Sequence, residues 1–404
     1  MIIAGHQVDD AMFTYIASHI DADTCKLLLK VEPKLSFDKS FAILQIECRH
    51  KAKNKMPQLL KQEKFLFPKA ISAEQCTHEA VAHFHSSLFH FNDHVLDMTM
   101  GLGVDDYYIS QCVKEVTTVE IDPEIAEVGV YNFSFLALNV NVLNADSVEY
   151  LKQLSDDMHF DAIFIDPARR GEGGKRLYGF ADCQPDVLSL LPLIKRHCSR
   201  LYIKASPMLD VTQSMRELGE ALVDVIAVSV KNECKELLFV LDFEESKQSV
   251  TFIAMNYDGN EWQRFESDWS CHIGQGALWP NIEDFSFLYE PNASIMKLGC
   301  YDAVERDFGV SQIAPSSHLM VSDRLVVEFP GRQFKVIEVI PFKGKEIKLL
   351  SKRYSQLNVA TRNFRLSAEA LKKRLGVQDG GDTYLFGTTL ANGEQVLVLC
   401  EKIN

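Results

Sequence analysis

Short apolar segments alternate with helical stretches from residue 93 onward, and this alternation limits the possible folds more than any other feature. The segments are His94 to Thr99, Val116 to Ile121, Val140 to Leu143, Phe160 to Ile165 and Arg200 to Lys204. Strands that alternate with helices form a parallel sheet with crossover helices. Two later segments, around Glu236 to Asp242 and Val250 to Asn256, lack a long helix between them. They predict a closing hairpin with one antiparallel strand at the sheet edge.

The bulk properties are those of a water-soluble protein with more than one domain. The chain has 404 residues, 47% of them hydrophobic and 24% charged, which predicts two or three domains. No apolar run is long enough to span a bilayer, and the N-terminus does not resemble a secretory signal. Ten cysteines without a CxxC pair favour reduced thiols, so we expect a cytoplasmic protein without a membrane segment.

A glycine-containing turn, Asp97 to Gly103, follows the first strand. Glycine lacks Cβ, so Gly101 and Gly103 allow the backbone to approach a ligand closely. A dinucleotide site needs a small residue three positions after Gly103. This chain has Asp106 there, a carboxylate that would face a pyrophosphate. The turn therefore favours a ligand with a cationic group near Asp97.

S-adenosylmethionine is such a ligand, and each of its polar parts matches an acidic residue at a strand end. Its ammonium would bind Asp97, its ribose diol Glu120 and its adenine amine Asp146. The expected cofactor-binding residues are Asp97, Thr99, Gly101, Gly103, Glu120, Ile121, Asp146, Ser147 and Asp166. The alternative is an unoccupied turn of an α/β domain.

The fourth strand ends in Asp166-Pro167-Ala168-Arg169-Arg170, and its tip would face the same crevice as Gly101. Methyl transfer is an in-line displacement, in which the enzyme mainly has to position the nucleophile. Asp166, with the carbonyl of Pro167, could hold an exocyclic amine, so we expect these two residues to be catalytic. The alternative for Asp166 is a turn cap.

Residues 71 to 256 resemble class I methyltransferases that act on nucleic acid, which carry Asp/Asn-Pro-Pro followed by an aromatic residue. This chain departs at Ala168 and Arg169, so Tyr178 or Phe180 would have to stack on a base, unless they are packing residues. Asp-Pro-x-Arg also resembles RNA uridine C5 methyltransferases, but the run 203–207 lacks their cysteine. The resemblance therefore implies a nitrogen acceptor, with guanine N2 favoured by similarity to guanine-N2 enzymes.

Basic residues gather in three places, although the net charge is −14. The loop 169–182 offers Arg169, Arg170, Lys175 and Arg176 to a phosphate-bearing substrate, or it is a solvated lid. From residue 49 to 64, six Lys/Arg face one Glu, either on a solvated helix or on a phosphate-binding surface.

The third basic stretch, residues 342–376, carries ten Lys/Arg against two Glu. Arg362 and Arg365 are expected to bind substrate there, with Tyr354 and Phe364 between the charges as stacking groups for RNA. A helix with a basic outer face is the alternative. We expect a helix from Ser367 to Leu375 that stops at Gly376, and β-rich runs at Arg324 to Phe329, Phe334 to Pro341 and Gln395 to Glu401.

Four histidines, His78, His83, His85 and His90, suggest a metal site before the first strand. His83 and His85 would lie on different faces of a helix, and no Cys/Glu cluster completes a ligand set. We therefore expect no metal.

Two further runs, 287–295 and 361–385, resemble the THUMP-like C-terminal domain of a bacterial methyltransferase family. The resemblance implies an α/β class I methyltransferase with a Rossmann-like seven-stranded sheet, a helical N-terminal region and an α+β THUMP-like domain. The predicted boundaries are 1–70 (helical), 71–256 (methyltransferase), 257–284 (linker) and 285–404 (THUMP-like).

The family resemblance implies methylation of an RNA nitrogen, in a tRNA or an rRNA. Two alternatives stay open: a methyltransferase of a protein or small molecule, and a non-catalytic RNA-binding relic of the fold. The sequence does not indicate an oligomeric state.

Overall fold

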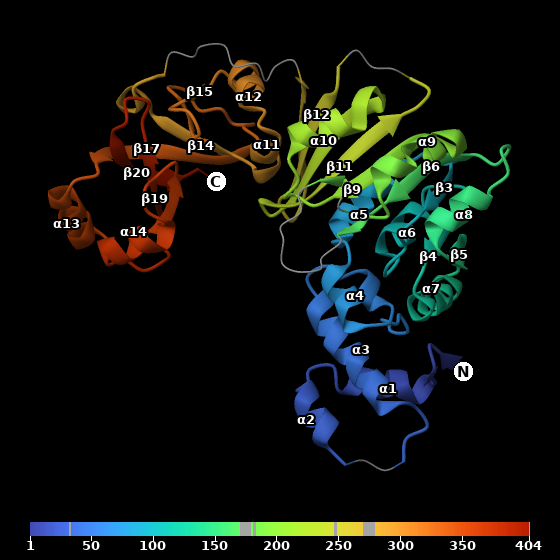
Figure 1. Ribbon diagram of the computed structural model, residues 1–404. Helices are drawn as coiled ribbons and strands as arrows, with labels where there is room; N and C mark the ends of the chain where they lie inside the picture. Colours follow the sequence, from blue (N-terminus) through green and yellow to red (C-terminus); the bar gives the residue numbers. More distant parts are fainter. Residues whose placement is uncertain (32–33, 170–178, 181–182, 246–248, 270–278, 404) are drawn as a thin grey trace. The chain divides into compact units, whose positions relative to one another are not determined.

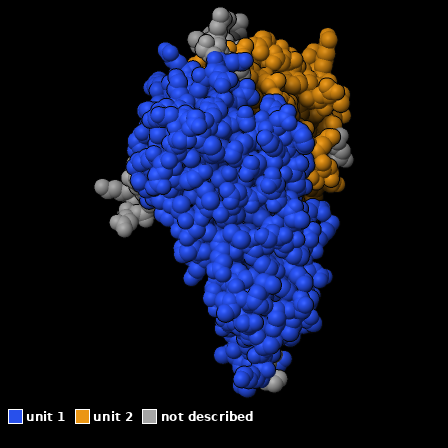
Figure 2. All heavy atoms as spheres, turned by 90° about the vertical axis from the view of Figure 1, so that its right-hand side faces the viewer, with its two compact units in different colours: residues 1–223, 237–247 blue, residues 224–236, 248–404 orange. Residues whose placement is uncertain are grey.

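The computed structural model describes residues 1–31, 34–169, 179–180, 183–245, 249–269 and 279–403 (Figure 1). The chain divides into two compact units, residues 1–223 with 237–247, and residues 224–236 with 248–404 (Figure 2). The domain boundaries drawn from the sequence differ from this division and stay a prediction. In the described ranges, no helix is long and apolar enough to cross a membrane.

Helices form the start of the first unit, and aspartates cap three of them. Helices α1 (Asp10–Ser18), α2 (Thr24–Leu29) and α3 (Lys39–Ala52) each follow an aspartate whose carboxylate accepts backbone N–H groups of the first turn. The short hairpin of β1 (Ile2–Ile3) and β2 (His6–Gln7) precedes them. Helices α4 (Ala70–Gln75) and α5 (Glu79–Ser86) follow.

This helical region shares a hydrophobic core with the α/β part of the first unit. Met12 and Phe41 are buried together with Val128 of α7 (Pro123–Phe135). The Asn132 side chain also donates to the backbone carbonyl of Leu66 and accepts its N–H, both at 2.9 Å. Buried backbone groups need such partners, so the contact fixes the chain where it enters the α/β part.

Five parallel strands form the centre of the first unit, as the sequence predicts. They are β3 (His94–Asp97), β4 (Glu115–Glu120), β5 (Val140–Asn144), β6 (Phe160–Ile165) and β9 (Cys198–Ala205), in the order β9-β6-β3-β4-β5. Residues 237–242 of β11 (Glu233–Asp242) pair antiparallel with β9. The intervening helices include α6 (Val104–Ile109), α7, α8 (Ser147–Gln153), α9 (Val187–His197) and α10 (Val211–Leu218). The chain order reverses between β3 and β6, which is where such sheets bind ligands.

The prediction of a closing hairpin is wrong, because the sequence analysis missed β10 (Leu222–Val230). Strand β12 (Thr251–Tyr257) runs parallel to β10 and antiparallel to β13 (Trp262–Asp268). The apolar centre of β12 is buried, so the strand needs a neighbour on each side. Strand β13 lies within residues 257–284, which we expected to be a linker. Strands β3, β4, β5, β6, β9, β10 and β11 are the seven strands expected. Strands β12 and β13 extend the same sheet.

The second unit also contains a seven-stranded sheet of order β15-β16-β14-β17-β20-β19-β18. Its elements are β14 (Phe287–Pro291), α11 (Ala293–Leu298), α12 (Tyr301–Phe308), β15 (Ser311–Gln312), β16 (Met320–Ser322), β17 (Gly331–Pro341), α13 (Gly344–Arg353), β18 (Asn358–Arg362), α14 (Ala368–Leu375), β19 (Thr383–Thr389) and β20 (Gln395–Lys402). Ser367 caps α14 and Gly376 ends it at φ +70°, as predicted. Residues 324–329, predicted to be β-rich, lie outside any strand.

Candidate active site

A cavity of about 1050 Å³ lies at the carboxyl ends of β3, β4, β5 and β6. Its wall includes Asp97, Gly101, Glu120, Asp146 and Asp166, which come from four separate strand ends. The structure thus brings together acidic residues that are up to 69 positions apart in the sequence (Asp97 to Asp166). Thr99, Ile121 and Ser147 also line this cavity.

The two glycines of the turn after β3 differ in what surrounds them. Both have positive φ, +56° for Gly101 and +75° for Gly103, which side chains rarely adopt. A Cβ on Gly103 would lie 2.5 Å from the Phe133 ring of α7, whereas a Cβ on Gly101 would meet nothing closer than 4.0 Å. Gly103 therefore allows helix α6 to start against α7, and Gly101 borders the open cavity.

Asp97, the last residue of β3, is 2% exposed and borders the cavity. Its Oδ1 accepts hydrogen bonds from the backbone N–H of Thr99 (2.7 Å) and from the Thr99 hydroxyl (3.3 Å). Burial, together with the nearby carboxylates of Asp105 and Asp166, raises the pKa of Asp97 from 3.8 to about 7. A buried carboxylate is costly without a cation, so this one favours a positively charged ligand group.

Asp106 does not face the ligand, contrary to the assumption made from the sequence. It is fully buried and accepts a hydrogen bond from the Thr118 hydroxyl at 3.1 Å. Burial and the charge of Asp97 raise its pKa well above the ordinary value. Consecutive helix residues point about 100° apart, so it is Asp105 that lines the cavity.

Glu120 and Asp146 are held by backbone N–H groups at their strand ends. Glu120 accepts from the N–H of Gly101 (3.0 Å, Oε2) and of Asp122 (2.9 Å, Oε1). Asp146 caps α8, and its Oδ1 accepts from Val148 at 2.8 Å. The contact between Glu120 and Gly101 links the two strand ends, so that the carboxylate has a defined position beside the turn.

Asp166 follows β6 directly, and both its backbone and its side chain are anchored. Its N–H donates to Thr99 Oγ1 at 2.7 Å. Its carboxylate is 44% exposed, lines the cavity and accepts a hydrogen bond from Lys204 Nζ at 2.7 Å. Pro167 is buried, and Ala168 begins β7 (Ala168–Arg169), which pairs with β8 (Cys183–Gln184). Asp166 can therefore present a fixed oxygen to a molecule in the cavity.

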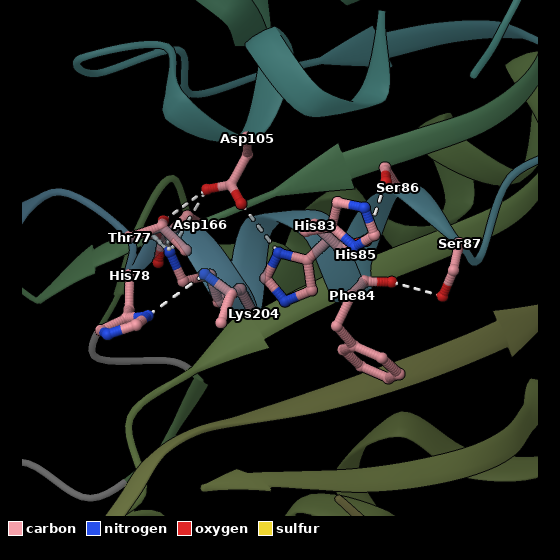
Figure 3. A network of polar contacts seen from close by, with 11 residues as sticks. Thr77, His78, His83, Phe84, His85, Ser86, Ser87, Asp105, Asp166 and Lys204 are labelled. Atoms are coloured by element: carbon pink, nitrogen blue, oxygen red, sulfur yellow. Dashed lines mark hydrogen bonds and ion pairs between the residues drawn. The ribbon is translucent and has the colours of Figure 1, made fainter. Parts of the chain in front are cut away.

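Lys204 belongs to a polar network that the sequence analysis missed (Figure 3). Besides Asp166, its Nζ contacts Thr77 Oγ1 at 2.8 Å and Asp105 Oδ2 at 3.6 Å. Asp105 also accepts from Thr77 and contacts His85 Nδ1 at 2.8 Å. Although burial alone would raise it, Lys204 and His85 hold the pKa of Asp105 well below its usual range. One available signal was Lys204 itself, a charge directly after the apolar run 201–203.

Three of the four histidines considered for a metal have other side-chain contacts. His78 caps α5 by accepting the N–H of Ala80 (3.2 Å), and His83 lies edge-on to Tyr108. His85 is bound to Asp105. Within the described residues, no three His, Cys, Asp or Glu side chains are grouped as they would be to hold a metal ion.

Several expected substrate contacts have no described side chain. Arg170, Lys175, Arg176 and Tyr178 lie outside the described residues, and Arg169 is described only by its backbone in β7. Phe180 is fully buried and packs edge-on against Phe239, which favours the packing alternative over base stacking.

Basic residues of the stretch 49–64 bind other groups of the same chain. Arg49 is buried and donates to the carbonyl groups of Glu63 (2.7 Å) and Phe65 (2.8 Å). Lys51 pairs with Glu47 and Glu74 at 2.6 and 2.7 Å. These contacts favour a structural role over a phosphate-binding surface.

The two arginines predicted to bind substrate in the C-terminal part differ. Arg362 contacts the fully buried Glu290 at 2.6 Å, and Arg332 contacts the same carboxylate, so Arg362 is part of a buried ion cluster. Arg365 lies over the ring of Phe342 at 4.7 Å and lines a groove of about 570 Å³ in the second unit. Phe364 packs on Phe342 as well. Of the two arginines, Arg365 is the one placed to meet a substrate.

Comparison with protein families matches the C-terminal part of the chain. Residues 331–402 match a family described as THUMP domain-like, and residues 287–330 match one described as a ferredoxin-like domain. An uncharacterized RNA methyltransferase of Mycoplasma mobile is 37% identical over 87 residues, which is 21% of this chain. The match spans 23% of that relative's length.

A solved structure matches the whole chain. It is titled "putative methyltransferase" from Porphyromonas gingivalis W83, is 28% identical and covers 100% of both chains with a TM-score of 0.87. This likeness agrees with the strand order around β3 and with the cavity at the strand ends. The chain thus has the fold of a class I methyltransferase and a C-terminal THUMP-like domain, which confirms the fold class expected from its sequence.

Proposed function

We propose that the chain transfers a methyl group from S-adenosylmethionine to a nitrogen of RNA, with guanine N2 the favoured acceptor. The observation that carries this proposal is the cavity itself. It gathers the carboxylates of Asp97, Glu120, Asp146 and Asp166 around the glycine turn.

The residues present fit the cofactor. Asp97 is a buried carboxylate beside the cavity, and the ammonium group of the cofactor would supply the missing positive charge. Glu120 would accept the ribose hydroxyls. Asp146 uses Oδ1 to cap α8, and the carboxylate would also receive the adenine amine. Ile121 is 65% exposed at the cavity and would pack against the adenine ring.

The bound cofactor would supply an electrophilic methyl group, and the chain's own residues would position the acceptor. Asp166 would accept a hydrogen bond from the acceptor N–H, and the carbonyl of Pro167 would be the second acceptor. Holding the nitrogen in line with the methyl group replaces a collision in solution with a fixed geometry, which is a large part of such a catalyst's effect.

Two observations support RNA as the substrate. The relative from Mycoplasma mobile is named as an RNA methyltransferase, and the C-terminal part matches a THUMP domain-like family. Arg365 and Phe364 line one groove of that part and offer it a charge and an aromatic ring, as nucleic-acid contacts require. A tRNA or an rRNA would satisfy both observations.

The test is transfer of tritium from methyl-labelled S-adenosylmethionine to total RNA from a strain that lacks the gene. The full chain should label RNA, and Asp166→Ala should lower the rate by about a hundredfold or more, since misplacement of the acceptor by about 1 Å can cost that much. Calorimetry with S-adenosylhomocysteine should show that Asp166→Ala still binds and that Glu120→Gln binds more weakly. Label in the protein or metabolite fraction, with none in RNA, would contradict the proposal.

A further inference from the structure

Lys204 lies at the end of β9 with its side chain only 11% exposed, between two carboxylates from different elements (Figure 3). Asp166 approaches it at 2.7 Å from the tip of β6, and Asp105 at 3.6 Å from α6. The Thr77 hydroxyl, in the segment between α4 and α5, accepts a hydrogen bond from it at 2.8 Å. Three neighbours thus fix the position of one ammonium group.

Asp105 is the stable partner of this ammonium. Its side chain is 13% exposed, and Thr77 and His85 both contact its carboxylate. The depressed pKa of Asp105, which Lys204 and His85 cause against the effect of burial, shows that it stays ionised. Asp105 and Thr77 therefore hold Lys204, and Lys204 contacts Asp166 at the cavity wall.

We propose that Lys204 is a positioning residue for the transfer, whose ammonium keeps the Asp166 carboxylate ionised and oriented as a hydrogen-bond acceptor. The inference rests on the proposed function and narrows its substrate. An ionised carboxylate attracts a nitrogen that carries hydrogen, such as an exocyclic amine. It repels a ring nitrogen that presents only a lone pair. The site therefore selects N–H acceptors over nitrogens such as guanine N7.

The transfer balances without a further reactant. As the N–C bond forms, the S–C bond of the sulfonium breaks and its electron pair stays on sulfur. The methylated nitrogen then carries a positive charge and releases one proton to water. The Asp166 carboxylate, held by Lys204, accepts a hydrogen bond from the N–H group and so orients it.

Other charged groups also face Asp166 and set its response to pH. Asp97 from β3 repels its charge, and Lys204 from β9 attracts it. Removing Lys204 takes this attraction away and leaves the repulsion from Asp97 in place. The carboxyl group of Asp166 should then take up a proton at a higher pH than in the natural chain.

The first experiment needs no RNA. Infrared difference spectra of the full chain across pH detect the carbonyl band of a protonated carboxyl group. Lys204→Met should show additional protonated carboxyl bands near neutral pH, since Asp105 and Asp166 both lose a cation, and the Asp166 band should be absent from Lys204→Met/Asp166→Asn. The surface variant Lys26→Met, whose lysine is 85% exposed in α2, should match the natural chain. A Lys204→Met titration that matches the natural chain would overturn the inference.

The second experiment measures tritium transfer to total RNA from the deletion strain. Lys204→Met should lower the rate by about ten- to a hundredfold, the range of one charge-assisted hydrogen bond, while Lys204→Arg keeps more activity. If Lys204 acts through Asp166, Lys204→Met/Asp166→Asn should be no slower than Asp166→Asn alone. If the rate losses of Lys204→Met and Asp166→Asn multiply in the double variant, the two residues act independently, which would contradict the inference.

A lone buried charge could unfold the Lys204→Met chain, so a second variant removes the pair together. Lys204→Gln/Asp105→Asn leaves no unpaired charge between these two positions. It should show the Asp166 band and the same slow transfer, with calorimetric binding of S-adenosylhomocysteine within about threefold of the natural chain. Absence of RNA labelling by the natural chain would contradict the proposed function, whereas the infrared result alone decides the coupling of Lys204 to Asp166.

Discussion

The hydroxyl of Thr99 accepts the backbone N–H of Asp166 at 2.7 Å, and so ties the glycine turn after β3 to the tip of β6. The same hydroxyl lies 3.3 Å from Asp97 Oδ1. One side chain thereby connects the residue proposed for the cofactor's ammonium to the residue proposed for the acceptor nitrogen.

Thr99→Val keeps the shape of the side chain but removes this acceptor. An unsatisfied N–H costs about 1–3 kcal/mol, so transfer to RNA should fall about tenfold or more as Asp166 loses its anchor. Thr99→Ser keeps the hydroxyl and should retain most activity. Initial rates of the two variants decide the point, and equal rates for Val and Ser would contradict this account.

Gly103→Ala should destabilise the chain by about 2–4 kcal/mol, because a positive φ and a contact of 2.5 Å to Phe133 act together. Gly101→Ala has the same backbone problem without the contact, so its loss should be smaller. Chemical denaturation of both variants gives the comparison. In a Phe133→Leu background the loss from Gly103→Ala should shrink, and an unchanged loss would show that the ring is not the cause.

Asp97 should make cofactor binding depend on pH. Its folded pKa of about 7 lies above the ordinary 3.8, so the folded chain holds an extra proton between these values. The stability from this group is fully present below about pH 3.8 and is lost as pH rises to about 7. An ammonium group prefers the ionised carboxylate, so binding near pH 6 should release a proton.

Calorimetry with S-adenosylhomocysteine at pH 6, in two buffers of different ionisation enthalpy, measures that release. Asp97→Asn should abolish it and weaken binding. Proton release of the same size in Asp97→Asn would assign the effect to another group.

Replacing Arg362 should lower the stability of the chain, whereas replacing Arg365 should weaken its binding to tRNA. Arg362→Met leaves the fully buried Glu290 with one partner fewer, which should cost about 3 kcal/mol. Arg365→Met removes an exposed cation over Phe342, so it should leave stability within about 0.5 kcal/mol and weaken retention of bulk tRNA on filters. Thermal denaturation and filter binding separate them. The account fails if Arg362→Met is as stable as the natural chain, or if Arg365→Met binds tRNA equally well.

The sequence predicted the parts that depend on local patterns. Strands β3 to β6 and β9 carry apolar runs before polar ends, so their positions and the carboxylates after them could be read directly. The order of the last strands could not be predicted, because an apolar run does not indicate which strand it pairs with. Strand β12 pairs with β10 and β13.

Contacts between distant side chains were also beyond the sequence. Lys204 meets Thr77, which is 127 positions away, and Arg362 of β18 meets Glu290 of β14. Charge counts alone placed Arg362 with the substrate, since an arginine that binds phosphate and one that holds a buried glutamate look alike in a sequence.

The central claim is methylation of an RNA nitrogen that carries hydrogen. Nucleoside mass spectrometry of RNA from a gene-deletion strain, before and after incubation with the full chain and S-adenosylmethionine, tests it most directly. The account predicts the gain of one methylated nucleoside with the methyl group on an exocyclic amine, N2-methylguanosine first among them, and no gain with Asp166→Ala. A methyl group on a ring carbon or on guanine N7, or an unchanged nucleoside profile, would contradict it.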